Sequence, residues 1–271
     1  MKKLFLPLFV LLCCSANAGD NTPLGARSMA TAGCGTAFTG DLWNAHNNQA
    51  GLAFIKDFQA GIFYENRFLV DNLGMKAFAA AMPIKNGVFG VEVNAMGLGK
   101  LYSENKFGIS YAKTFGPKFA ASVQLNYLNT FIGENYGTTA TVCGEFGLIA
   151  IPVKNLVIGF HLFNPTRSKL SGNLDERLPT IMRLGALYNF SKQVFLTVEA
   201  EKDVDFNPTI RGGIEYRPTP NFYLRVGAAA NPSLMAFGFG IVNKKLRLDI
   251  STSFHSQLGF SPAIGLQYGI N

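Results

Sequence analysis

The chain has 271 residues, of which 48% are hydrophobic, 13% are aromatic and 15% are charged, with a formal net charge of +7. This mild positive balance, without a basic cluster, implies no nucleic-acid partner. The 24 phenylalanines, 9 tyrosines and 29 glycines beside a single tryptophan are unusual for a soluble α/β enzyme and suit a β protein that faces lipid.

Residues 1–18 have the pattern of a secretory signal peptide. Lys2 and Lys3 precede an apolar run, 4–14, that is too short to span a membrane. The small residues before position 19 predict cleavage after Ala18, and a lipid-modified Cys13 or Cys14 is less favoured because a bulky residue precedes each. We therefore predict export of a chain that begins at residue 19.

Residues 19–57 show no alternation of apolar and polar side chains, and they are neither highly charged nor of low complexity. We predict that this segment is a plug folded into the lumen of a barrel formed by residues 58–271. Three of the expected strands, 221–230, 233–242 and 258–269, have small residues on their inward parity, including Gly227, Gly238, Gly240, Gly259 and Gly265. Small residues let another backbone come close, so we expect the plug to lie against these three strands.

From residue 58 onward the sequence divides into short alternating runs bounded by turn residues. They predict fourteen strands, near 58–67, 74–84, 87–97, 103–114, 118–129, 139–151, 155–164, 179–190, 192–202, 208–217, 221–230, 233–242, 245–254 and 258–269. Every second connection is tight, and the others are mostly longer, as at 129–139 and 164–179. This pattern predicts an antiparallel outer-membrane β-barrel with short periplasmic turns, both ends of the barrel in the periplasm, and contact with outer-membrane lipid.

The alternation assigns each strand a lipid face and a lumen face. In 245–254, Leu246, Leu248 and Ile250 alternate with Arg247 and Asp249. A soluble sandwich would also alternate, but the signal peptide and the aromatic content favour a barrel. The charges of mixed sign predict ion pairing across the lumen and not an ion-selective pore. The predicted luminal charges are Glu92, Glu145, Arg183, Glu199, Glu201, Arg211, Glu215, Arg225, Arg247 and Asp249.

No catalytic, metal or cofactor site is predicted. The three histidines, His46, His161 and His255, lack metal-ligand spacing, and Ser256 would point away from its neighbour His255 on a strand. Cys34 and Cys143 could pair in an exported protein, but two small buried residues are the favoured interpretation.

Pro262 falls inside the last predicted strand, on the lipid parity, and removes one backbone donor from the sheet. It marks either a weak seam that admits a hydrophobic ligand or a docking strand, or an edge irregularity near the rim, which is the favoured interpretation.

The stretch 25–54 begins with Gly25 and Arg27, continues through the small residues from Gly33 to Ala37 and Asp41, and ends in the run 47–53. In these residues it resembles the N-terminal plug of the FadL-type long-chain fatty-acid transporter superfamily, and especially its PorV/PorQ branch. Gln49 stands where that plug usually has proline, and 163–165 and 211–232 also resemble the second half of PorV/PorQ barrels. The resemblance implies a fourteen-stranded plugged barrel. The matching plug residues are Gly25, Arg27, Asp41, Asn47, Asn48, Ala50 and Gly51.

Two non-enzymatic functions are expected from this resemblance. The first is an accessory barrel of a type IX secretion-like system that acts through a translocon or a cargo protein. The second is FadL-like passive transport of small hydrophobic molecules. Short outer loops and a charge-paired lumen favour the first, the plug motif and Pro262 are compatible with the second, and a purely structural barrel is a third alternative.

Overall fold

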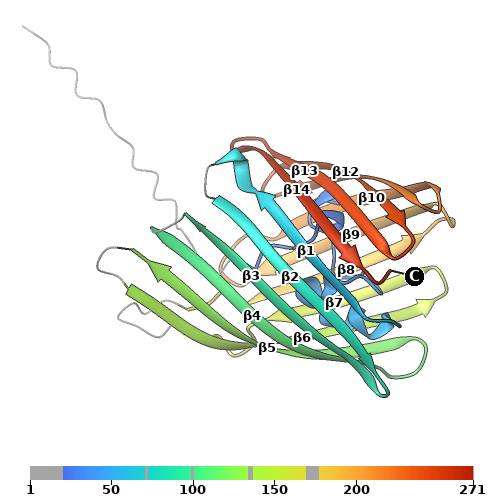
Figure 1. Ribbon diagram of the computed structural model, residues 1–271, viewed down its shortest axis with the longest axis horizontal. Coiled ribbons are helices and arrows are strands. Elements are labelled where there is room, and N and C mark those ends of the chain that lie inside the picture. The colour runs from blue at the N-terminus through green and yellow to red at the C-terminus, as the bar shows by residue number, and fades with distance from the viewer. Residues whose placement is uncertain (1–20, 71–72, 99–100, 134–136, 169–176, 271) are drawn as a thin grey trace, which may run out of the picture.

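The computed structural model describes residues 21–70, 73–98, 101–133, 137–168 and 177–270. The predicted signal peptide and parts of the connections 129–139 and 164–179 lie outside the described residues. Within them, fourteen antiparallel strands close into a barrel in chain order, with β1 paired to both β2 and β14 (Figure 1). The strands are β1 Gln59–Asn66, β2 Leu73–Ile84, β3 Gly87–Leu98, β4 Tyr102–Thr114, β5 Phe119–Ile132, β6 Gly137–Val153, β7 Leu156–Phe163, β8 Ile181–Asn189, β9 Val194–Asp203, β10 Thr209–Thr219, β11 Phe222–Ala230, β12 Leu234–Asn243, β13 Leu246–His255 and β14 Gly259–Tyr268.

The fourteen-stranded antiparallel barrel predicted from the alternation is confirmed. The tight connections, such as those between β2 and β3 and between β12 and β13, lie at one end, which we call the short-turn end. The opposite end, which holds the connection between β7 and β8, is called the long-loop end. Among the described residues, no helix is long and apolar enough to cross a membrane.

The outer surface of the barrel is apolar and the inner surface is polar. Ile62, Leu125, Leu184 and Ile210 are each more than half exposed, at 57%, 63%, 56% and 63%. On β13, Leu246 is 49% exposed, whereas Asp249 on the other parity is 1% exposed. Because a soluble domain would place these groups the other way round, the exposed apolar band marks a transmembrane barrel that faces lipid.

Residues 21–57, which we call the inner segment, lie within the ring of strands up to Ile55, and the exposed Lys56 and Asp57 lead out to β1 (Figure 1). The segment contains two short α-helices, α1 (Ala26–Ala30) and α2 (Asn44–Asn47), and the 3-10 helix η1 (Gln49–Phe54); a second 3-10 helix, η2 (Arg67–Leu69), follows β1. Helix α1 is short because Thr31 ends it and Gly33, at a φ of 89°, donates back to Ser28.

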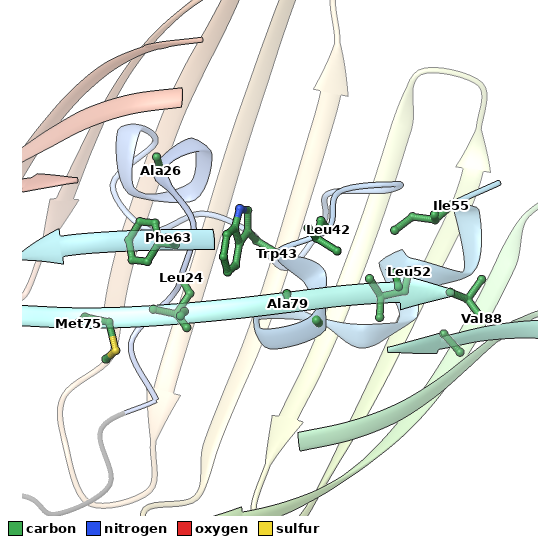
Figure 2. Close-up of a cluster of buried hydrophobic side chains, with 14 of the residues drawn as sticks. Leu24, Ala26, Leu42, Trp43, Leu52, Ile55, Phe63, Met75, Ala79 and Val88 are labelled. Atoms are coloured by element: carbon green, nitrogen blue, oxygen red, sulfur yellow. The ribbon is translucent and has the colours of Figure 1, made fainter. Parts of the chain in front are cut away.

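The main hydrophobic core joins the inner segment to strands β1–β4. Trp43 packs edge-on against Phe63 of β1, with 5.5 Å between ring centroids. Leu24 and Leu42 lie beside this pair, and Leu52 extends the same cluster toward Val88 (Figure 2). The apolar surface of this segment is therefore buried against the barrel wall and not exposed to water.

Helix α1 lies against β11, β12 and β14, as the small residues suggested, and also against β13. A Cβ atom at Gly238 would lie 2.6 Å from the Cβ of Ala30, so only glycine permits this approach. Two of the glycines that were expected to lie against the inner segment do not face it. Gly240 faces the side chains of Arg225 and Asp249, and Gly259 faces open space.

Candidate functional site

All ten predicted luminal charges point into the barrel. Nine are at least nine-tenths buried, and the side chain of Glu201 is 19% exposed. They form three groups of ion pairs, and the inner segment contacts each group. We call these groups the arginine cluster, the lysine cluster and the Glu199 cluster.

The arginine cluster joins α1 to β10, β11 and β13. Arg27 of the inner segment lies 3.0 Å from Asp41 and 2.9 Å from Glu215 of β10. Arg225 continues the chain of contacts, 2.7 Å from both Glu215 and Asp249. Arg247 and Arg217 complete the cluster through Asp249 and Glu215, at 2.6 and 2.7 Å. Buried charges are tolerated here because each has a partner of opposite sign.

The lysine cluster centres on Lys106 of β4. Its ammonium lies 2.6 Å from Glu145 and 2.8 Å from Glu92. Glu145 also accepts hydrogen bonds from Gln49 of η1 at 2.7 Å and pairs with His161 at 2.8 Å. Lys106 and Gln49 are not among the predicted luminal charges. The sequence does contain the pattern that places Lys106 on the lumen face, because Lys106 alternates with the outward-facing Phe107 and Ile109.

His46 of α2 connects this cluster to the start of the inner segment. Its Nδ1 lies 2.8 Å from a carboxylate oxygen of Glu92, and its Nε2 lies 2.9 Å from the carbonyl oxygen of Thr22. Both partners are acceptors, so a neutral imidazole can donate to only one of them and the charged form can donate to both.

The Glu199 cluster binds backbone as well as side chains. Glu199 of β9 accepts the N–H groups of Gly35 and Thr36, at 3.0 and 2.9 Å. Arg211 lies 4.0 Å from Glu199 and 2.9 Å from Glu201, and Arg183 lies 2.6 Å from Glu201. A carboxylate that accepts two consecutive backbone donors holds the turn of the inner segment in place.

The remaining plug-motif residues make contacts within the inner segment, and Asn48 also donates to the carbonyl oxygen of Leu148 in β6 at 3.1 Å. Asn47 exchanges two hydrogen bonds with the backbone of Leu24, at 2.9 and 2.8 Å. Asn48 caps η1 by accepting from Ala50 and donates to the carbonyl of Thr36 at 2.7 Å. Gly25 and Gly51 allow close contact: a Cβ atom would lie 2.5 Å from the Trp43 ring in the first case and 2.5 Å from the Phe38 carbonyl oxygen in the second.

The other polar candidates show no reactive arrangement. Cys34 and Cys143 are both free and buried, and burial, with Glu199 nearby, raises the pKa of the Cys34 thiol, so this thiol is a poor nucleophile. His255 accepts the backbone N–H groups of Gln257 and Leu258, at 3.2 Å each, and thereby closes a turn. Within the described ranges, no group of three or more histidine, cysteine or carboxylate side chains is placed to hold a metal ion.

A cavity of about 410 Å³ lies at the long-loop end. Met29 and Ala32 of the inner segment line one side of it, and Phe68 of η2 and Leu234 of β12 line another. Phe68 has a φ of 56°, which is rare for a bulky residue, and its ring meets His255 edge-on at 6.1 Å. Arg211 of the Glu199 cluster also reaches this cavity.

The junction of β1 and β14 borders the same cavity. The last register pair at this end joins Glu65 to Ala263, and the next residue of β14 is the exposed Pro262. Pro262 still lies opposite Thr252 of β13. Beyond it, Ser261 lines the cavity and accepts the backbone N–H of Phe68 at 2.9 Å.

The fold and this geometry define a transmembrane β-barrel whose bore is occupied by its own N-terminal residues. Solved structures share the fold. A FadL homologue from Pseudomonas aeruginosa matches with a TM-score of 0.66 and 13% identity, over 90% of this chain and 98% of that one. The monoaromatic hydrocarbon channel CymD matches with a TM-score of 0.72 and 13% identity, over 94% and 99% of the two chains. The Ralstonia pickettii toluene transporter TbuX matches with a TM-score of 0.70 and 13% identity, over 93% and 100%.

At these identities the similarity shows the fold of FadL-type barrels. No protein-family model and no curated sequence matches the chain. The finer assignment to the PorV/PorQ branch stays a prediction from the plug motif.

Proposed function

We propose that this protein is an outer-membrane channel of a Gram-negative bacterium for small hydrophobic molecules. The observation that carries the proposal is the cavity of about 410 Å³ at the long-loop end, because Met29, Phe68 and Leu234 form an apolar part of its wall. The charged side chains of Glu65, Arg67, Glu201 and Arg211 line the rest, together with smaller polar groups. This volume lies near the lower end of the range for small-molecule sites. The fold shared with structures described as hydrocarbon channels and toluene transporters supports the same function.

The route that fits this geometry leaves the barrel sideways. The inner segment acts as a plug: it fills the bore and is held by three groups of buried ion pairs, so a straight path would have to break many of them. The cavity instead adjoins the point where the β1–β14 pairing ends, beside Pro262. A hydrophobic ligand that leaves there enters the lipid directly.

An accessory role in a type IX secretion-like system stays a prediction from the sequence. It would require a translocon or cargo protein that remains bound to the barrel. Extraction from the native membrane in mild detergent, followed by identification of proteins in stoichiometric amount, separates that role from a channel that purifies alone.

The direct test uses radiolabelled toluene as the probe, with the purified protein for binding and with Gram-negative cells that express it for uptake. Leu234→Arg places a charge in the apolar part of the wall and should lower both binding and uptake by at least about tenfold. Leu258→Arg, at an exposed position of the same end that does not line the cavity, serves as the control. Equal binding and uptake in the two variants would refute the assignment of the cavity as the ligand site.

A further inference from the structure

The short-turn end of the barrel has a ring of lysines. Among the described residues of that end, eight exposed lysines stand beside one carboxylate, Asp57. Five of the six tight turns contribute at least one of them. The lysines are Lys56, Lys85, Lys113, Lys118, Lys154, Lys192, Lys244 and Lys245.

The long-loop end has a smaller excess among its described residues. When exposed and half-buried side chains are counted together and Glu201 of the Glu199 cluster is left out, it has five cations and three carboxylates, whereas the short-turn end has nine cations, with Arg217 included, and one carboxylate. The cations of the long-loop end are Arg67, Lys76, Arg167, Arg177 and Lys202, and its carboxylates are Glu104, Asp203 and Asp205. The excess of positive charge is therefore larger at the short-turn end.

Aromatic side chains place this rim at the boundary of the membrane. Aromatic rings gather at the level of the lysines: Phe89 lies 5.2 Å from Tyr111, Phe115 lies 6.2 Å from Phe119, and Tyr188 lies 4.9 Å from Phe190, measured between centroids. Rings in such belts lie at the depth of the lipid headgroups. The adjoining turns, and the ammonium of Lys113 at 5.8 Å from the Phe115 ring, therefore lie beside lipid phosphates.

The geometry points to a specific interaction surface: the lysine ring binds the headgroups of anionic glycerophospholipids in the leaflet that borders the short-turn end. The distribution of the charge favours lipid over a protein partner, because the lysines are spread around the circumference and a docked protein would need them in one patch. Attraction of this kind falls with ionic strength. The inference depends only on the barrel lying in a membrane and is independent of what the cavity transports.

The test uses the full folded chain in bicelles made from equal amounts of phosphatidylglycerol and phosphatidylcholine, with retained lipids counted by native mass spectrometry. The test variant carries Lys85→Gln, Lys154→Gln and Lys192→Gln, one on each of three separate turns. The matched control carries Lys76→Gln, Arg167→Gln and Lys202→Gln at the long-loop end. Heat-dependent migration on a gel verifies that each variant is folded.

The wild-type protein should retain at least about three times as many phosphatidylglycerol molecules as phosphatidylcholine molecules. The preference should fall by half or more in the short-turn variant, persist in the control and weaken as salt is raised. The absence of a preference in the wild type, an equal loss in both variants, or a loss only in the control would overturn the proposal. Preferential retention of lipopolysaccharide, offered in a parallel sample, would also overturn it.

Discussion

At the scale of single residues, glycines in the barrel wall allow the inner segment to lie close to the strands. Gly227 of β11 lies opposite Gly213 of β10 in the sheet register. A Cβ atom at Gly227 would lie 2.5 Å from the backbone nitrogen of Ala32, and one at Gly213 would lie 2.6 Å from the Cβ of Thr31. The two glycines thus form a slot for the end of α1, and real side chains do not approach this closely.

Replacing Gly227 with valine should displace α1 from the barrel wall. Overpacking of this kind costs about 1–3 kcal/mol. The single tryptophan reports the change, because Trp43 is 2% exposed and packs against Gly25, directly before α1. Its fluorescence emission should shift to longer wavelength in Gly227→Val. Gly212→Val is the control, since a Cβ there meets its nearest atom, the Thr197 carbonyl oxygen, at an ordinary 3.5 Å. Unchanged emission in Gly227→Val would contradict the prediction.

At the scale of elements, the strands were predictable because their alternation is imposed locally by lipid on one side and the lumen on the other. The stretch expected at 245–254 is β13, Leu246–His255. The short helices were not predictable. Helix α1 has five residues and α2 has four, too few to show a helical period.

The partners within the clusters were less predictable than their members. The sequence placed Glu215 and Arg225 on the lumen face, but Arg27 pairs with Glu215 across 188 residues of chain. Sequence alternation specifies which side a residue faces and leaves open which distant residue lies opposite. The plug motif was recognisable by resemblance, whereas the hydrogen bonds of Asn47 and Asn48 depend on how the segment folds back on itself.

The link between α1 and the sheet should depend on Arg27. Methionine at this position keeps much of the apolar stem, removes the guanidinium, and leaves Asp41 buried without its cation. Removing one partner of a buried ion pair typically costs about 3–5 kcal/mol. The inner segment of Arg27→Met should therefore be cleaved by proteinase K while the strands stay resistant. Arg27→Lys should be intermediate, because an ammonium lacks the planar fork that reaches two carboxylates.

The exposed Arg177 gives the matched control for this experiment. Arg177→Met should leave the cleavage pattern of the inner segment as in the wild type, since exposed charges contribute little to stability. Equal resistance of Arg27→Met and the wild type would show that the arginine cluster does not hold the segment.

At the scale of the whole molecule, the barrel reverses the arrangement of a soluble protein. Its outer face is apolar, and its interior is filled by a segment that satisfies the inward charges. A filled bore is incompatible with a wide aqueous pore, and the cavity at the long-loop end borders the point where the β1–β14 pairing ends. Two routes for a ligand therefore differ in what must move. A straight route through the bore requires the inner segment to move, whereas an exit beside Pro262 does not.

A disulfide between the inner segment and the wall separates these two routes. A Cβ atom at Gly265 of β14 would lie 3.6 Å from the Cβ of Ala26 in α1. Disulfides join Cβ atoms about 3.5–4.5 Å apart, so Ala26→Cys with Gly265→Cys should cross-link with little distortion. Cys34 and Cys143 are first replaced by alanine so that only the new pair can form.

If ligands leave sideways beside Pro262, toluene uptake by cells with the oxidised variant should equal uptake with the same variant in reduced form. The reason is that the cross-link restrains α1 without altering the side chains of Phe68 and Leu234, which line the cavity. The two single-cysteine variants control for the substitutions themselves, and mass spectrometry measures the cross-linked fraction. Uptake that disappears on oxidation and returns on reduction would show that the inner segment must move, and the lateral route would be wrong.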